Sequence, residues 1–154
     1  MLQDGRIKSI ECLELYNFKS FADYHYIGPF LRFTSIIGPN GGGKSNISDA
    51  ICFVFGLQSE TIRCHDPQDV IYRQETFKGE KSIKKKKQKK RDCWVALTLN
   101  MSNETQLKLR RTLSAEGDGE FFIDGKNIDN DGYQYFLASN DIFPYSRNFL
   151  ISQG

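Results

Sequence analysis

Apolar and polar side chains alternate over residues 7–15 (IKSIECLEL), near the start of the chain. Because successive residues of a strand point to opposite faces, this pattern predicts a half-buried strand. Its predicted core-facing positions are Ile10, Cys12 and Leu15. The chain therefore begins with β-structure.

A strand-like run and a helix-like run flank a glycine-rich segment. A short strand is predicted over residues 24–27, and a turn at Gly28-Pro29 leads into the β-type run 31–37 (LRFTSII). Residues 45–55 predict a helix, because apolar residues recur there at the spacing of one helical face. That face consists of Ile47, Ala50, Ile51, Val54 and Phe55.

The second half of the chain predicts hairpins. Residues 94–100 and 105–113 alternate and form two strands of one hairpin. A third strand over residues 120–123 ends in Asp124-Gly125, a frequent two-residue hairpin turn. Residues 131–137 predict a short helix with one apolar face made of Tyr133, Phe136 and Leu137.

Charge is distributed unevenly. The net charge is +2, but residues 81–91 (KSIKKKKQKKR) hold eight basic and no acidic residues, which leaves 13 basic against 19 acidic residues elsewhere. Residues 73–91 predict a flexible, solvated insertion, with a DNA-backbone contact or a nuclear targeting signal as alternatives. No aromatic residue lies within 79–91, so a DNA contact there is expected to be blind to base sequence. The preceding segment 66–72 predicts a short helix capped by Asp66.

The remaining composition indicates one globular domain of 154 residues, with 39% apolar residues. No apolar run approaches the ~20 residues of a membrane span, so an intracellular chain without a membrane partner is expected. Among the four cysteines, Cys12 and Cys52 are expected in the core. Cys64-His65 alone offers too few ligands for zinc.

The glycine-rich segment fits the phosphate-binding pattern G-x-x-x-x-G-K-[ST] at every fixed position. Glycines let successive backbone N–H groups turn inward around an anion. Lys44 is expected to reach the β- and γ-phosphates of a nucleotide, and the Ser45 hydroxyl is expected to ligate Mg²⁺. The positive end of the following helix points at the same phosphates. The segment reads Gly38, Pro39, Asn40, Gly41, Gly42, Gly43, Lys44, Ser45.

Beyond this motif, the chain resembles the N-terminal head segment of the structural maintenance of chromosomes (SMC) ATPases. The resemblance rests on segments 17–21 (NFKSF), 27–30 (IGPF), 33–41 (FTSIIGPNG) and 44–56 (KSNISDAICFVFG), and it is weakest from 74 to 106. These segments are most similar to the cohesin subunit that pairs with the C-terminus of the kleisin, with the condensin large subunit or a related DNA-repair ATPase as the alternative. Gly42 stands where the family usually has Ser, which is expected to cost one contact at most, because the cradle is backbone.

The resemblance implies further site residues. Lys19 matches a basic residue that approaches the nucleotide, and Arg63 matches an arginine near the phosphates or DNA, with a solvated surface arginine as the alternative. Gln153 matches a glutamine that ligates Mg²⁺ or orients the attacking water, and an amide oxygen suits both roles. Ser20 and Asn46 complete the predicted nucleotide site, in which Lys44 and Gln153 are catalytic and Ser45 and Gln153 hold the metal.

Two segments only imitate other parts of such an ATPase. Residues 121–124 (FFID) resemble a Walker B strand, but three apolar residues are few, and Gly125 follows where a catalytic glutamate is required. The hairpin interpretation accounts for all of them. Residues 113–117 (LSAEG) lack the paired glycines of a signature loop and predict a turn.

The predicted fold class is α/β: a P-loop NTPase, the N-terminal lobe of an ABC-type SMC head over residues 1–154, with a parallel strand leading into the loop and with β-hairpins. The resemblance implies ATP and Mg²⁺ binding, and ATP hydrolysis by the complete head in organising chromosomal DNA, as in sister chromatid cohesion in the nucleus. It implies four partners: the C-terminal half of the head, a second SMC head, a kleisin subunit and DNA. Because that C-terminal half carries Walker B and the signature loop, the chain is expected to be a fragment that is inactive alone.

Two rival classes of function remain open at this point. A small-molecule phosphotransferase usually carries the loop close to its N-terminus, whereas 37 residues precede Gly38 here. A non-catalytic nucleic-acid module driven by residues 81–91 would bind DNA whether or not Lys44 is present.

Overall fold

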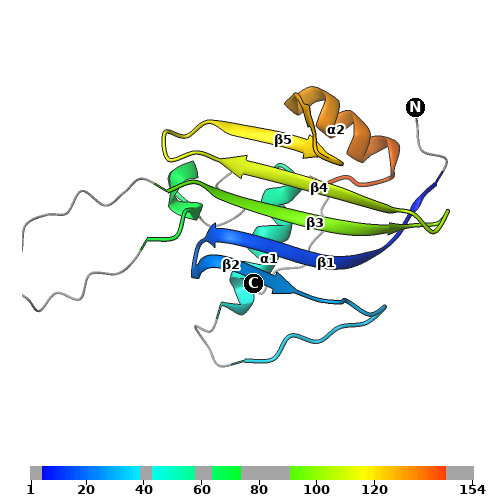
Figure 1. Ribbon diagram of the computed structural model, residues 1–154, viewed down its shortest axis with the longest axis horizontal. Helices are drawn as coiled ribbons and strands as arrows, with labels where there is room; N and C mark the ends of the chain where they lie inside the picture. The colour runs from blue at the N-terminus through cyan, green and yellow to red at the C-terminus, as the bar shows by residue number, and fades with distance from the viewer. Residues whose placement is uncertain (1–4, 39–42, 58–63, 74–90, 145–154) are drawn as a thin grey trace, which may run out of the picture.

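One six-stranded antiparallel sheet organises the protein (Figure 1). The computed structural model describes residues 5–38, 43–57, 64–73 and 91–144. The strand order is β2-β1-β3-β4-β5-β6, in which sequence neighbours pair except where β3 lies beside β1. The strands are β1 (Ile7–Phe18), β2 (Phe21–Ile27), β3 (Cys93–Met101), β4 (Gln106–Leu113), β5 (Gly119–Ile123) and β6 (Lys126–Ile128).

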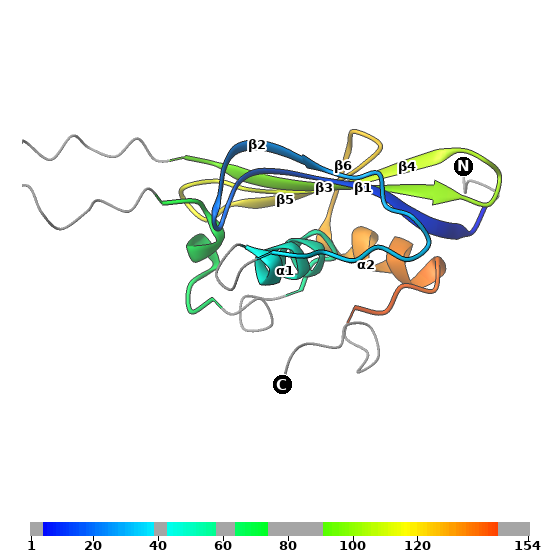
Figure 2. The same ribbon diagram turned by 90° about the horizontal axis from the view of Figure 1, so that it is seen from below.

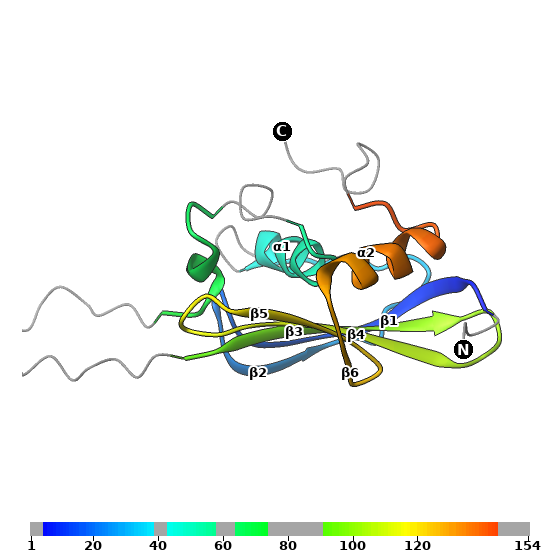
Figure 3. The same cartoon turned by 90° about the horizontal axis from the view of Figure 1, so that it is seen from above.

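Two α-helices, α1 (Lys44–Val54) and α2 (Asn130–Ser139), cover one face of the sheet, and the opposite face is open (Figure 2, Figure 3). The core lies between this covered face and the helices. None of the helices within the described ranges is long and apolar enough to cross a membrane. Fully buried core side chains include Leu13, Leu15, Val95, Leu97 and Leu109 from the sheet and Ala50, Phe53 and Val54 from α1.

Helix α1 confirms the prediction for residues 45–55, because four of its five predicted face residues are buried and Ile51 is half-buried. Two polar side chains, the half-buried Arg111 and the buried Tyr133, tie its C-terminal end to the rest of the core. From β4, the Arg111 guanidinium donates to the carbonyls of Phe53 and Leu57 at 3.0 and 3.1 Å. From α2, the Tyr133 hydroxyl donates to the carbonyl of Val54 at 2.5 Å. The helix is therefore anchored at the end remote from the glycine-rich segment.

The side chains of strand β1 do not alternate regularly between the two faces of the sheet along the whole strand. Its pairing with β3 shifts register between Ile10 and Cys12, and a bulge resets which side chains face the core. Leu13 and Leu15 join the core cluster, as predicted for Leu15. Cys12 is buried at 7% exposure, as predicted, although it lies outside the cluster that contains Leu13 and Leu15.

The strand predicted over residues 31–37 does not form, and the sheet contains no parallel pair within the described residues. Leu31, Phe33 and Ile37 are 75%, 86% and 92% exposed. A strand requires hydrogen-bonding neighbours, and all six strands of the described chain pair with one another instead. Segment 31–37 therefore lies outside the sheet that the described residues form.

The hairpin predictions are confirmed. β3 pairs with β4 along its length: Cys93 lies opposite Leu113 at one end, and Asn100 lies opposite Gln106 at the other. β5 and β6 turn at Asp124-Gly125, where both residues have positive φ (49° and 80°). The predicted short helix near Asp66 is a 3-10 helix, η1 (Pro67–Val70), capped by the Asp66 side chain. In α2, Tyr133 and Leu137 are buried and Phe136 is half-buried, as predicted.

Candidate functional site

The N-terminus of α1 has the properties of an anion-binding helix end. Gly43 precedes the helix with φ 89°, a left-handed conformation that side chains strain to adopt. No side chain caps the first turn, and that turn contains no acidic residue. The Asn46 N–H already donates to the Gly43 carbonyl at 3.0 Å, whereas the N–H groups of Lys44 and Ser45 have no partner among the described residues. These two groups and the helix dipole are available to a negatively charged ligand.

Lys44 joins the two ends of the phosphate-binding motif. Its ammonium group donates to the carbonyl of Gly38, six residues earlier, at 2.5 Å. Lys44 is half-buried, whereas Ser45 is exposed at the same helix end. A cation and a hydroxyl thus stand beside the uncapped first turn, and this donor set fits a phosphate group and a hard metal ion.

The turn between β1 and β2 packs against this helix end. The Asn46 side-chain amide donates to the Ser20 hydroxyl at 2.8 Å. A Cβ placed on Gly43 would lie 3.0 Å from the same Ser20 oxygen and 3.5 Å from the Phe21 ring. This close approach gives a second reason for glycine at position 43. It brings two residues of the NFKSF segment to the end of the phosphate-binding motif.

Lys19, in the same turn, forms an ion pair with Asp49 of α1. Its ammonium lies 2.7 Å from a carboxylate oxygen of Asp49, and the two side chains are only 12% and 8% exposed. Cys64 lies beside the pair; burial raises the pKa of its thiol, and the Lys19 ammonium partly opposes this increase. Sequence reasoning missed Asp49, although an aspartate beside the apolar stripe of a helix signals a buried cation partner.

The structure brings together part of the predicted site: Lys19, Ser20, Gly38, Gly43, Lys44, Ser45 and Asn46. The remaining predicted residues, Pro39, Asn40, Gly41, Gly42, Arg63 and Gln153, lie outside the described residues.

Asp124 lies in a hairpin turn, as the hairpin interpretation of residues 121–124 predicts. Its carboxylate accepts the backbone N–H of Lys108 at 2.8 Å, and it occupies the tight turn between β5 and β6. No group of three or more potential metal ligands occurs in the described part of the chain. The Asp124 carboxylate therefore holds the β5–β6 turn against β4.

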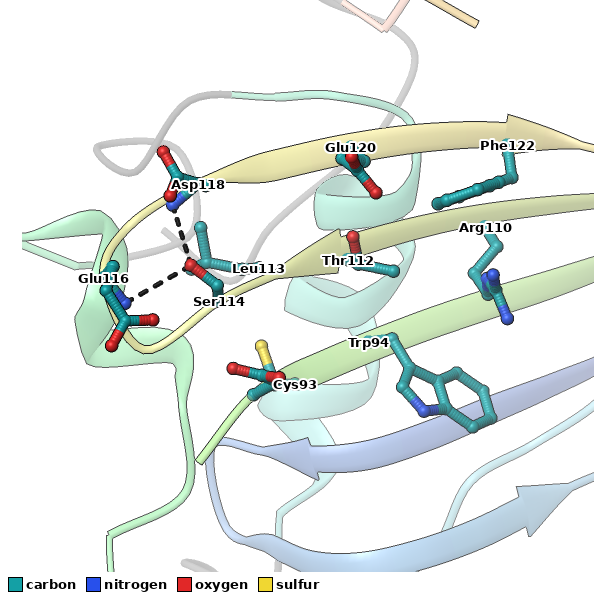
Figure 4. A pocket seen from close by; sticks show the side chains of 11 residues that line it. Cys93, Trp94, Arg110, Thr112, Leu113, Ser114, Glu116, Asp118, Glu120 and Phe122 are labelled. Atoms are coloured by element: carbon teal, nitrogen blue, oxygen red, sulfur yellow. Dashed lines mark hydrogen bonds between the residues drawn. The ribbon is translucent and has the colours of Figure 1, made fainter. Parts of the chain in front are cut away.

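A groove of about 590 Å³ lies on the opposite, open face of the sheet (Figure 4). Trp94, Arg110 and Phe122 line this groove, together with four carboxylate residues: Asp92, Glu116, Asp118 and Glu120. The Arg110 guanidinium lies 4.5 Å over the Phe122 ring. Four carboxylates make this groove a poor site for phosphate groups.

A second cavity, of about 720 Å³, lies next to the candidate site. The segment that precedes the phosphate-binding motif supplies Leu31, Thr34 and Ile36 to its wall. Ile47 and Ile51 of α1 line it as well, so the cavity separates this segment from the helix. Its lining is mainly apolar, as is typical of a surface that another chain segment covers.

Comparisons with known proteins match the sequence to one protein family. The sequence matches the RecF/RecN/SMC N terminal domain over residues 9–146. The "Structural maintenance of chromosomes protein 1" of Arabidopsis thaliana is 39% identical over 142 residues, which cover 92% of this chain and 11% of that protein. The protein of the same name from Schizosaccharomyces pombe is 37% identical over 92% of this chain and 12% of that protein. The chain therefore spans about a tenth of the length of these relatives.

Solved structures agree with the sequence comparison. A structure from a study of ATP-driven dimerisation and DNA-stimulated activation of SMC ATPases is 28% identical, with a TM-score of 0.79, over 94% of this chain and 87% of that one. An SMC head bound to the C-winged helix domain of ScpA is 31% identical, with a TM-score of 0.77, over 92% of this chain and 43% of that one. These similarities confirm the predicted fold class, the N-terminal lobe of an SMC-type ATPase head.

Proposed function

Since the chain belongs to the RecF/RecN/SMC N terminal domain family, we propose that it is the nucleotide-binding N-terminal half of an ATPase head that organises chromosomal DNA. One observation carries this proposal. The half-buried ammonium of Lys44 closes back onto Gly38 at the uncapped N-terminus of α1, so both ends of the phosphate-binding motif meet there. An anion at this position gains a cation, backbone N–H donors and the helix dipole together.

Each residue at this helix end has a separate role in the proposed site. Lys44 holds the β- and γ-phosphates of ATP as a fixed cation, and the Ser45 hydroxyl offers an oxygen ligand to Mg²⁺. Lys19 and Ser20 approach from the β1–β2 turn, and Asn46 fixes that turn through its bond to Ser20. When bound, Mg²⁺ supplies charge neutralisation of the terminal phosphates. Gln153 is proposed to join the metal site, and Arg63 the phosphate site.

Hydrolysis is proposed to require a second polypeptide segment. The Asp49 carboxylate of α1 is paired with Lys19, and the described residues contain no group of three or more potential metal ligands. The exposed apolar segment 31–37 and the neighbouring cavity offer a surface for additional strands. We assign that surface to the C-terminal half of the head, which in this family supplies Walker B and the signature loop. We refer to residues 1–154 combined with that half as the reconstituted head.

The relatives suggest further partners. One neighbouring structure is an SMC head bound to the C-winged helix domain of ScpA, and another comes from a study of ATP-driven dimerisation. By analogy, the reconstituted head is proposed to bind a kleisin subunit and a second SMC head, and to act on chromosomal DNA in the nucleus. Residues 81–91 are the proposed DNA contact, because they concentrate eight basic residues.

Sister chromatid cohesion is the favoured process. Identity reaches 39% and 37% with two relatives named Structural maintenance of chromosomes protein 1. A condensin-type role is the second candidate, because "Structural maintenance of chromosomes protein 4" of Schizosaccharomyces pombe is 32% identical over 150 residues. The higher identity to the first pair favours the cohesin-type role.

ATP turnover as a function of protein concentration tests the proposed function. Residues 1–154 alone should show no turnover above background. The reconstituted head should hydrolyse ATP, and its rate per head should rise with concentration, because two heads must enclose the nucleotide. Robust hydrolysis by residues 1–154 alone, lost in Asp124→Asn, would show that the β5–β6 hairpin is catalytic and that the proposed division of labour is wrong.

A further inference from the structure

The open face of the sheet carries a row of side chains that crosses five strands. The row consists of Tyr24, Tyr16, Trp94, Thr112 and Glu120, each directly opposite the next on the neighbouring strand. Residues paired in this way share one face of a sheet. Leu15 and Val95, which precede and follow two members of the row in sequence, are buried in the core, so the row lies on the open face.

The three aromatic rings of this row form one continuous surface. The Trp94 ring lies 6.0 Å from the Tyr16 ring at an interplanar angle of 14°, and 6.1 Å from the Tyr24 ring. The Tyr24 hydroxyl donates to the Glu14 carboxylate at 2.7 Å, and the Tyr24 side chain is 52% exposed. Because these rings already hold one another in place, a partner that binds them pays little entropy for ordering them. Tyrosine and tryptophan are also enriched where proteins bind other proteins.

The groove of about 590 Å³ continues this aromatic surface, because Trp94 lines both. Its lining holds four carboxylate residues and one basic residue, Arg110. Two of the carboxylate residues, Asp118 and Glu120, are exposed. A concave surface lined mainly by one sign of charge attracts groups of the opposite sign. The groove therefore favours a cationic ligand.

We propose that the aromatic row and the groove together form a docking surface for a Lys/Arg-rich peptide segment of a partner protein. Aromatic rings, tryptophan above all, attract an ammonium or guanidinium group within about 6 Å of the ring centroid. Carboxylates accept charge-assisted hydrogen bonds from the same groups. The groove already contains one such arrangement, because the Arg110 guanidinium lies 4.5 Å over the Phe122 ring (Figure 4).

This docking surface is separate from the proposed nucleotide site. Helix α1, which carries that site, covers the other face of the sheet (Figure 2, Figure 3). The inference therefore stands whether or not ATP binds at the helix end.

The carboxylates decide between a basic peptide and a nucleic acid as the occupant. Exposed aromatic rings on a sheet also stack nucleic-acid bases. Phosphate groups, however, would be repelled by Asp118 and Glu120, which lie at the strand that carries one end of the row. Removing these two charges should weaken the binding of a basic peptide and strengthen that of a nucleic acid.

Fluorescence of Trp94, the single tryptophan of residues 1–154, reports directly on the docking surface. Titration with a deca-arginine peptide should change this fluorescence in a saturable way. Combining Asp118→Asn with Glu120→Gln should weaken the binding about fivefold, as expected for the loss of two exposed charge contacts. Both side chains are exposed, so the variant should keep the fold.

The matched control combines Glu104→Gln with Asp131→Asn, which removes two exposed carboxylates that do not line the groove. This control should bind the peptide as the wild type does. An unchanged Trp94 fluorescence in the wild type, or equal losses in the two double variants, would overturn the proposed docking surface.

Two further arms test the other occupants. If a ten-residue oligodeoxythymidine changes the Trp94 fluorescence and binds more tightly to the variant with Asp118→Asn and Glu120→Gln, the surface takes nucleic acid and the proposal is wrong. If the peptide binds only after residues 81–91 are deleted, the basic segment of the chain itself occupies the groove, and the proposal of a separate partner is wrong.

Discussion

Replacing Arg111 with Met should destabilise the protein by about 3 kcal/mol, because the Arg111 guanidinium holds the C-terminal end of α1. It donates to two carbonyls, those of Phe53 and Leu57, and lies 4.4 Å over the Phe53 ring. One hydrogen bond to a charged group contributes about 1.5–3 kcal/mol and a partly buried cation–π contact about 1 kcal/mol. Methionine keeps the apolar stem, so the loss is mainly that of the polar contacts.

Urea unfolding followed by the fluorescence of the single tryptophan, Trp94, measures this change. The matched control is Arg110→Met: Arg110 is the preceding residue on β4, but its guanidinium lies over Phe122 on the open face of the sheet. The control should lose less than about 1 kcal/mol. Equal losses in the two variants, or a loss below about 0.5 kcal/mol for Arg111→Met, would refute the argument that Arg111 anchors α1.

Three further predictions concern the site and its surroundings. Ser45→Ala should weaken ATP binding mainly when Mg²⁺ is present, and an equal loss with and without metal, measured by calorimetry, would contradict the metal-ligand role. Deleting residues 81–91 should change the free energy of unfolding by no more than about 0.5 kcal/mol. The deletion should also lower the affinity for non-specific DNA and make that affinity less dependent on salt. A sharp drop in thermal stability would show that the segment is structural. Phe33→Ser combined with Ile37→Ser should weaken association with the C-terminal half in sedimentation experiments without lowering the stability of residues 1–154, because both side chains are more than 80% exposed; unchanged association would remove segment 31–37 from that interface.

Short-range patterns predicted most of the fold. The Asp124-Gly125 turn, the β3–β4 hairpin and the apolar face of α1 depend on residues close together in the sequence, and each is confirmed. The bulge in β1 was not predictable, because it depends on the pairing with β3, some 85 residues away. The run 31–37 has the composition of a strand but lacks a neighbour, so strand propensity alone gave the wrong result there.

In the candidate site, too, short-range features were predictable and long-range contacts were not. The phosphate-binding motif is local, and its ends at Gly38 and Lys44 meet as its pattern predicts. The Asp49–Lys19 pair joins residues 30 positions apart on different elements. The sequence does not predict this pair, because no spacing rule connects a residue in a turn to a residue in a distant helix. The family resemblance identified Lys19, and only the packing of the turn against α1 identified its partner.

Isothermal titration calorimetry of ATP into the reconstituted head, with and without Lys44→Ala, tests whether the N-terminus of α1 is the nucleotide site. Lys44 is half-buried at a helix end outside the hydrophobic core, so the variant should keep the circular dichroism spectrum and unfolding temperature of the wild type. The wild type should bind ATP, and Lys44→Ala should show no binding at the same protein concentration. Unchanged ATP affinity in the folded variant would contradict the assignment of this helix end as the nucleotide site.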